Sequence, residues 1–260
     1  GANNVDVRVP DRVEFGYGLS VALVDTIQDA PPDLLVTVDA GISSIDGVAR
    51  AVELGCKVIV TDHHLPGDKL PAADAILNPN CHGDAFPSKS LAGVGVVFYL
   101  LSVLRQVLRE RDWFTYPRQE PNLAHLLDLV ALGTVADLVK LDENNRILVR
   151  QGIERIRAGH CSTGLLALLR LGNRDYRHLV ASDLAFAVAP RLNAAGRLED
   201  MSVGIRCLLT DDREEAMALA TELDTLNHQR KAHQSSMQSD ASEQIRALLA
   251  RLEDAELPAA

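Results

Sequence analysis

The 260 residues lack several features that mark particular classes of protein, such as membrane proteins and secreted proteins. No apolar run reaches the ~18 residues that a membrane-spanning helix needs. The richest stretch, 91–104, is interrupted by Gly93, Gly95 and Ser102. The first four residues, 1–4, are polar and do not form the apolar segment of a signal peptide. We therefore expect a cytoplasmic protein with no membrane partner.

The sequence also lacks paired cysteines. Four cysteines lie far apart without a C-x-x-C spacing, namely Cys56, Cys81, Cys161 and Cys207. This spacing disfavours a zinc knuckle and fits free thiols in a reducing compartment.

An excess of positive charge is missing as well. The 26 lysines and arginines are outnumbered by 36 aspartates and glutamates, which gives a net charge of -10. Such a chain is a poor stand-alone DNA binder. However, a site that gathers carboxylates is acidic until its metal ions bind, and bound cations invert the local field. Charge therefore does not exclude an enzyme that processes DNA.

The first half of the chain alternates between strand-like and helix-like patterns. Apolar, largely β-branched runs predict strands over 5–9, 34–39, 57–61 and 74–78. Helical spacing predicts helices over 19–29, 44–55 and 91–111. This alternation is typical of an α/β fold with a doubly wound parallel sheet.

Only helices are predicted in the second half of the chain. Four of them cover 122–135, 143–158, 163–171 and 180–188. A longer, acid-rich helix is predicted over 211–255, and its apolar spacing indicates a helix that lies partly free of the core, as an interdomain connector does. These patterns divide the chain into a domain over 1–211 and a connector helix over 212–260.

Polar residues that are able to bind metal follow two of the predicted strands. Asp39 ends one strand, and Asp62, His63 and His64 directly follow the next. Because the carboxyl ends of parallel strands meet at one edge of a sheet, we expect these four residues around one crevice. Mixed carboxylate and imidazole ligands suit manganese or a similar divalent ion better than calcium. The alternative is that Asp39 and Asp62 only cap the helices that follow them.

Further segments extend this pattern over nearly the whole chain. They are VPDR (9–12), GYGLS (16–20), TVDAGISS (37–44), VTDHHLP (60–66), PSKSLAGVG (87–95), GTVAD (133–137) and PRLNAAGRL (190–198). A D-H-H tripeptide alone is weak evidence, but these blocks in this order are strong evidence. The sequence resembles the DHH phosphoesterase superfamily, and within it the bacterial exonucleases that are specific for single-stranded DNA.

The resemblance implies a role for each residue of the site. Asp39 would bridge two divalent ions, manganese or magnesium, and His63 and Asp137 would bind one of them. Asp62 and His64 would orient the ligand imidazole and touch the phosphate. Two ions so held are able to activate a water and to stabilise the leaving oxygen of an in-line displacement.

Two other groups are candidates for substrate binding. Gly93 and Gly95 open a predicted helix, whose free backbone N–H groups are able to hold a phosphate. The alternative is close packing of that helix against the sheet. Arg191, Asn193 and Arg197 form a polar cluster for which the resemblance implies a phosphate contact, and structural salt bridging is the alternative.

One motif of the resembling family has no match in the chain. Its D-x-D-x-D-G segment, whose aspartates complete the coordination of both ions, would lie upstream of Val5. We therefore expect an N-terminally truncated fragment, itself inactive, that also lacks the family's C-terminal domains.

The expected parent is a metal-dependent 5′-to-3′ exonuclease that hydrolyses single-stranded DNA in repair and recombination. The resemblance implies single-stranded DNA, a single-strand-binding protein and a helicase as partners. One alternative is a hydrolase of small phosphodiesters or pyrophosphate from the same superfamily. Another is a catalytically inactive scaffold, against which the presence of Asp39, His63, His64 and Asp137 argues.

Overall fold

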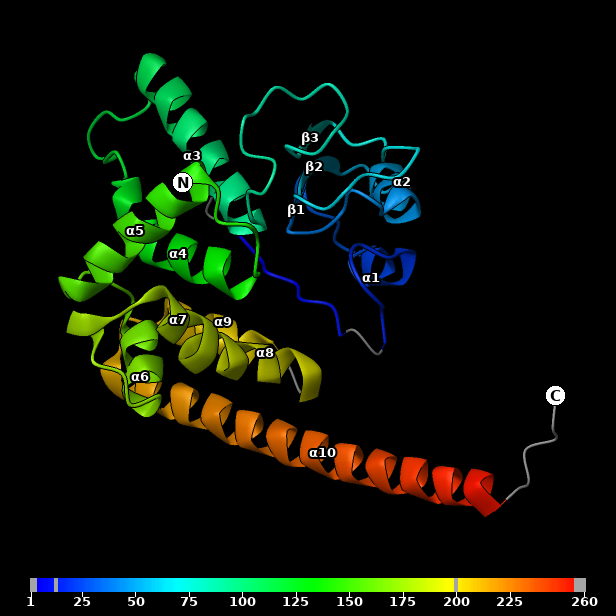
Figure 1. Cartoon of the computed structure of the whole chain (residues 1–260). Coiled ribbons are helices and arrows are strands. Elements are labelled where there is room, and N and C mark those ends of the chain that lie inside the picture. The colour runs from blue at the N-terminus through cyan, green and yellow to red at the C-terminus, as the bar shows by residue number, and fades with distance from the viewer. Residues whose placement is uncertain (1–3, 12–13, 199–200, 255–260) are drawn as a thin grey trace.

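A small parallel sheet with two helices joins a larger helical part (Figure 1). The structure, a computed structural model, describes residues 4–11, 14–198 and 201–254. The side chains of 197–198, 239–240, 243 and 247–254 lie outside the described part.

The sheet has the strand order β1-β2-β3, and both pairs are parallel. Its strands are β1 (Leu34–Val38), β2 (Lys57–Thr61) and β3 (Ala75–Leu77). In the register, Thr61 pairs with Val38 on one side and with Leu77 on the other. The three strands therefore end level with one another, and the residues that follow them share one edge of the sheet.

Two short helices bury one side of the sheet. They are α1 (Val21–Asp25) and α2 (Ile45–Glu53). Val24 of α1, Val48 of α2 and Val58 and Val60 of β2 are fully buried in one cluster. The helix predicted over 19–29 is shorter than expected, because turns replace it after Asp25.

Strand β1 is hydrogen-bonded on one edge only among the described residues. Its side chains alternate, so that Leu34, Val36 and Val38 are exposed while Thr37 is buried. The strand predicted over 5–9 is wrong. Its alternating valines remain exposed, because this segment neither pairs with a strand nor packs on a core.

The second half is helical, as predicted. Its first elements are α3 (Gly93–Glu110), the 3₁₀ turn η1 (Leu123–Leu126), α4 (Leu127–Ala136), α5 (Glu143–Arg157) and α6 (Thr163–Leu171). They are followed by η2 (Tyr176–His178), α7 (Ala181–Asp183), the π-helical turn η3 (Leu184–Val188), α8 (Ala189–Leu198), α9 (Ser202–Leu209) and α10 (Arg213–Asp254). Helices α8 and α9 were not predicted.

The largest hydrophobic core lies in this helical part, where Ile156, Leu165, Leu184 and Leu223 are fully buried. Helix α10 contacts α6, α8 and α9, and Figure 1 shows its C-terminal half extending beyond them. Met237 in that half is 71% exposed. The first part of α10 thus belongs to the core, and the division at 211/212 stays a prediction.

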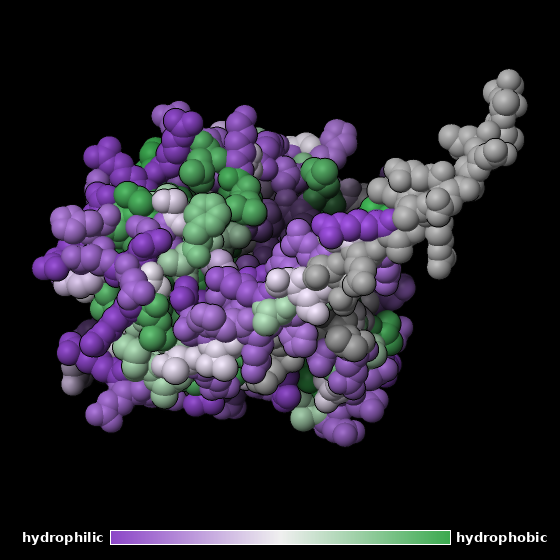
Figure 2. Space-filling model, turned by 60° about the horizontal axis from the view of Figure 1, so that its bottom comes forward, coloured by the Kyte–Doolittle hydropathy of each residue, from purple (hydrophilic) through white to green (hydrophobic). Residues whose placement is uncertain are grey.

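The surface is mainly polar on the face that Figure 2 shows, with hydrophobic side chains gathered in small groups. Such scattered apolar exposure is ordinary for folded proteins. Within the described ranges, no helix combines the length and the apolar composition needed to cross a membrane.

Candidate metal centre

The ends of β1 and β2 deliver Asp39 and the Asp62-His63-His64 segment to the same edge of the sheet. Asp39 follows β1 directly and has a φ of 57°, a left-handed conformation that aspartate tolerates better than most residues. Its half-exposed side chain abuts the first residue of α3. A Cβ added to Gly93 would lie 2.4 Å from Asp39 Oδ1. Because glycine has no side chain, position 93 leaves room for the Asp39 carboxylate.

Asp62 organises the two histidines. Its buried carboxylate accepts hydrogen bonds from the backbone N–H groups of Ile42 at 2.9 Å, His63 at 2.7 Å and His64 at 3.1 Å. Its Oδ1 also lies 2.7 Å from His64 Nδ1. Burial opposes ionisation, but these hydrogen bonds, led by that of Ile42, lower the pKa of Asp62 below its ordinary value. Asp62 is therefore an anionic anchor beneath the histidine pair.

Two asparagines hold the same segment from the other side. Asn78 Nδ2 donates to the His64 carbonyl at 2.8 Å, and Asn80 Nδ2 donates to the His63 carbonyl at 2.6 Å. Both residues follow β3, whose end is level with that of β2. Neither asparagine was predicted to be a site residue, although their position after a third strand was the available signal.

His63 lies between two carboxylates from different elements. Its Nε2 is 3.0 Å from Asp39 Oδ1 and 3.3 Å from Asp137 Oδ2, at the C-terminal end of α4. Nevertheless, this buried Nε2 has no partner in hydrogen-bond geometry among the described residues. The Asp39 carboxylate raises the pKa of His63, against the effect of burial, and Asp137 adds to the rise. Burial in turn raises the pKa of Asp137.

His64 and Tyr17 complete the cluster. Asp39, His63 and His64 each offer a ligand atom within 4.8 Å of the others. The Tyr17 hydroxyl donates to the Asp39 carbonyl at 3.2 Å and lies 3.5 Å from His64 Nε2. Tyr17 was part of a matched block, but nothing in its sequence position indicated contact with both strand ends.

The donor set fits a divalent cation. Two carboxylates and an imidazole from β1, β2 and α4 converge, and such mixed oxygen and nitrogen donors suit manganese and similar ions. A buried imidazole nitrogen that faces carboxylates without a hydrogen bond needs another partner, because an unsatisfied buried polar atom is costly. A cation between these groups would supply that partner.

The candidate substrate-binding residues lie in different surroundings. Gly93 and Gly95 are buried at the start of α3, and a Cβ on Gly95 would lie 2.6 Å from Leu91 Cδ1. Both glycines thus allow close packing, and phosphate binding there stays a prediction.

On α8, Arg191 forms an ion pair with Asp224 of α10 at 2.8 Å, while Asn193 is exposed. This contact is the structural salt bridge that was the alternative for Arg191. The side chain of Arg197 lies outside the described residues. Phosphate contacts by these residues stay predictions.

Comparisons with known proteins identify the family of this chain. The DHH family, N-terminal domain, matches residues 1–134. The chain is 60% identical over 242 residues to the single-stranded-DNA-specific exonuclease RecJ of Salmonella typhimurium, covering 93% of the chain and 42% of that protein. RecJ of Escherichia coli matches with the same identity and coverage, and RecJ of Bacillus subtilis is 39% identical over 241 residues, covering 93% of the chain and 29% of that protein. The chain thus spans less than half the length of these curated relatives.

Solved structures of RecJ are also similar to this chain. An exonuclease RecJ bound to manganese superposes with a TM-score of 0.77 at 36% identity, covering 90% of this chain and 56% of that one. RecJ from Thermus thermophilus in complex with Mn²⁺ has a TM-score of 0.72 at 36% identity, covering 84% and 31%. The family match extends over more than half of the 260 residues and includes the D-H-H segment at the sheet edge, so the chain belongs to the DHH family.

Proposed function

We propose that this chain is part of a metal-dependent exonuclease that hydrolyses single-stranded DNA from the 5′ end, in repair and recombination. The observation that carries the proposal is the buried His63 Nε2, which faces the Asp39 and Asp137 carboxylates without a hydrogen bond. The identity of up to 60% to exonucleases specific for single-stranded DNA supports this activity and substrate.

In this proposal, Asp39, His63 and Asp137 would hold manganese or magnesium. The bound metal would activate a water and neutralise charge that develops on the phosphate. The chain's own groups prepare the site. Asp62 fixes the backbone of both histidines through its hydrogen bonds, and Asn80 fixes the His63 carbonyl. His64, whose side chain is 46% exposed, is available to touch the phosphate.

The substrate would be held by groups around this edge. We assign the start of α3 at Gly93 and Gly95 and the side chains of Asn193 and Arg197 to the DNA phosphates. The Gly95 N–H already donates to the Ala92 carbonyl at 2.8 Å, so the N–H of Gly93 would make the phosphate contact. Arg191 would contact a phosphate while it keeps its ion pair with Asp224. That ion pair fixes the direction of its guanidinium. In the longer protein, residues 212–260 would connect this domain, 1–211, to a further substrate-binding domain.

The proposed setting is the cytoplasm, where a single-strand-binding protein and a helicase would present the DNA strand. The four cysteines support a reducing compartment, because all are free thiols.

The first test is manganese binding by calorimetry, with the present chain beside a form extended upstream through a D-x-D-x-D-G segment. Digestion of oligonucleotides labelled at either end would be followed in both forms. We expect tight binding and 5′-to-3′ digestion in the extended form, and neither in the shorter one. Metal binding without DNA digestion in the extended form would instead favour a small phosphoester substrate. Absence of metal binding in both forms would favour a scaffold.

A further inference from the structure

Asn145 connects two loops that each lead to a carboxylate of the metal centre. It lies in the first turn of α5 and is fully buried. Its Nδ2 donates to the Ser90 carbonyl at 2.7 Å and to the Lys140 carbonyl at 2.9 Å. One side-chain amide thus joins two segments that are far apart in the sequence.

The loop that contains Ser90 leads to the support of Asp39. Three residues after Ser90, Gly93 begins α3. This first residue of the helix abuts the Asp39 side chain, since a Cβ added to it would lie 2.7 Å from Asp39 Cγ. The place at which α3 meets Asp39 therefore depends on how the loop before it is held.

The loop that contains Lys140 follows Asp137. Asp137 ends α4 three residues earlier, and its Oδ2 lies 3.3 Å from His63 Nε2. Between them, Leu138 has a φ of 58° and is 82% exposed, so this residue does not anchor the loop in a core. The bond from Asn145 to the Lys140 carbonyl therefore limits where the chain runs after Asp137.

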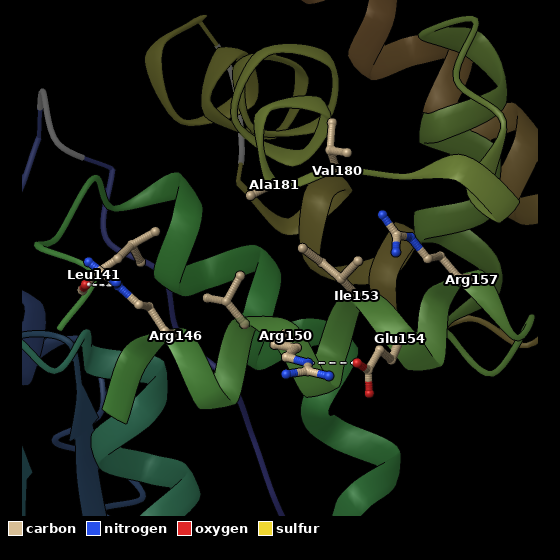
Figure 3. Close-up of a pocket in the computed structure, with 9 residues that line it drawn as sticks. Leu141, Arg146, Arg150, Ile153, Glu154, Arg157, Val180 and Ala181 are labelled. Atoms are coloured by element: carbon tan, nitrogen blue, oxygen red, sulfur yellow. Dashed lines mark hydrogen bonds and ion pairs between the residues drawn. The ribbon is translucent and has the colours of Figure 1, made fainter. Parts of the chain in front are cut away.

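Further bonds at the start of α5 hold the same two loops. Asp142 Oδ1 caps the helix by accepting from the Asn145 N–H at 2.9 Å, and Asp142 Oδ2 accepts from the Ser88 hydroxyl at 2.7 Å. Arg146 Nε donates to the Leu141 carbonyl at 2.8 Å, as Figure 3 shows at the edge of a surface pocket that both residues line. The first turn of α5 thus connects the two loops through several bonds, of which those of Asn145 are the most buried.

We propose that Asn145 is a positioning residue of the metal centre, which sets the separation of the Asp39 and Asp137 carboxylates that face His63. The inference rests on the proposed function, in which these groups hold a divalent cation. Because Asn145 is fully buried and donates to two carbonyls, it does not reach a substrate and acts only through the loops. Without its amide the two loops would separate more easily, and a cation would lose one of its carboxylates.

The alternative is that Asn145 only stabilises the fold. Its Oδ1 is buried and has no hydrogen-bond partner among the described residues, which is costly. The side chain therefore suits the geometry of two carbonyls better than it suits stability. The two roles differ in what a substitution changes. A purely stabilising residue affects the free energy of unfolding alone, whereas a positioning residue also affects the metal centre of a protein that is still folded.

The first test compares Asn145→Ala with Asn227→Ala. Asn227 is a second buried asparagine, on α10, and that helix contributes no described residue to the metal centre. Manganese binding would be measured by calorimetry in the form extended upstream. We expect Asn145→Ala to weaken binding about tenfold or more, as loss of groups that orient metal ligands does. Asn227→Ala should bind manganese like the wild type, and unfolding curves would verify that both variants are folded.

A second readout needs no metal. In the present chain, the NMR signals of the His63 ring report the carboxylates that lie 3.0 and 3.3 Å from its Nε2. Asn145→Ala should shift these signals, and Asn227→Ala should not. Absence of manganese binding in the wild-type extended form would contradict the proposed function, while the His63 signals would still decide the role of Asn145.

Ser88→Ala replaces Asn145→Ala if the latter does not fold. It removes only the hydroxyl that donates to Asp142, a bond that joins the same two loops. We expect it to weaken manganese binding about two- to tenfold and to shift the His63 signals. Three results would overturn the proposal. They are wild-type manganese binding and His63 signals in folded Asn145→Ala, an equal effect of Asn227→Ala, or, where Asn145→Ala does not fold, wild-type behaviour of Ser88→Ala.

Discussion

Asp39 combines a backbone requirement with a chemical one. Its φ of 57° suits aspartate, asparagine and glycine, and its carboxylate lies 3.0 Å from His63 Nε2. Asp39→Asn keeps the backbone preference and removes the charge. In the extended form, which we propose to be active, we expect this change to abolish cleavage. His64→Ala should cost only about 10–100-fold, as is usual for groups that orient ligands.

Digestion rates of single-stranded DNA with manganese would check this order. Unfolding curves of both variants serve as the control, since Asp39→Asn should fold like the wild type. Equal cleavage by Asp39→Asn and the wild type would rule out a metal-bridging role for Asp39.

The sequence predicted the charged residues of the centre better than their supports. Asp39, His63 and Asp137 were expected near one another, and in the structure His63 Nε2 lies 3.0 Å from Asp39 Oδ1 and 3.3 Å from Asp137 Oδ2. Their roles as metal ligands stay predictions. Asn80 was missed because it acts on a backbone carbonyl, and its position after β3 was the only trace of that contact in the sequence. Tyr17 was not singled out either, because its approach depends on a loop.

At the scale of elements, the close approach of α3 to the residue that follows β1 depends on Gly93. A methyl group there would lie 2.4 Å from Asp39 Oδ1 and 2.7 Å from Asp39 Cβ. We expect Gly93→Ala to displace Asp39, to weaken manganese binding in the extended form, and to lower the free energy of unfolding by about 1–3 kcal/mol. Calorimetry and denaturant unfolding would measure the two effects.

Gly67→Ala is the matched control for this change. A Cβ on Gly67 meets nothing within 4 Å, so the substitution should change stability by less than about 0.5 kcal/mol. Unchanged metal binding in Gly93→Ala would show that Asp39 does not depend on this close approach.

Helix α10 should contribute stability through its first part only. Leu223 is fully buried in the helical core, whereas Met237 on the same helix is 71% exposed. We expect Leu223→Ala to lower the free energy of unfolding by about 2–5 kcal/mol, and Met237→Ala to change it by less than about 0.5 kcal/mol. Urea denaturation of both variants would check the contrast, and similar losses in both would contradict it.

Elements with a strong apolar period were predicted well. The strands β1 and β2 and the helix α5 lie close to their predicted bounds. The prediction failed over 5–9, where the segment pairs with no described strand and its valines stay exposed. Alternation of apolar and polar residues is therefore not sufficient to form a strand. Helix α8 was missed because Pro190 and Gly196 disfavour a helix by propensity, and packing against α10 overrides that preference.

At the scale of the whole molecule, one partly buried and one buried thiol predict a loss of stability in alkaline solution. Burial raises the pKa of Cys161 to about 12 and that of Cys207 to about 11. Thiols of an unfolded chain titrate near ~8.5. Because the folded protein retains these protons more tightly, their contribution to stability is complete below the unfolded pKa and is lost as pH rises through the folded values.

We therefore expect the free energy of unfolding to fall as the pH rises from about 9 toward 12. Denaturant unfolding at several pH values would measure the slope. Cys161→Ala should make it shallower, since lysines and tyrosines titrate equally in both proteins. An identical slope in the variant would contradict the assignment to Cys161.

The exposed edge of β1 affects how this chain behaves at high concentration. Leu34, Val36 and Val38 present an apolar stripe beside backbone groups that no described strand pairs with. Such an edge is a template for a strand from another molecule. Sedimentation velocity should thus reveal self-association that grows with concentration. A lysine at Val36, pointing outward, should suppress this aggregation and make the chain easier to purify and crystallise.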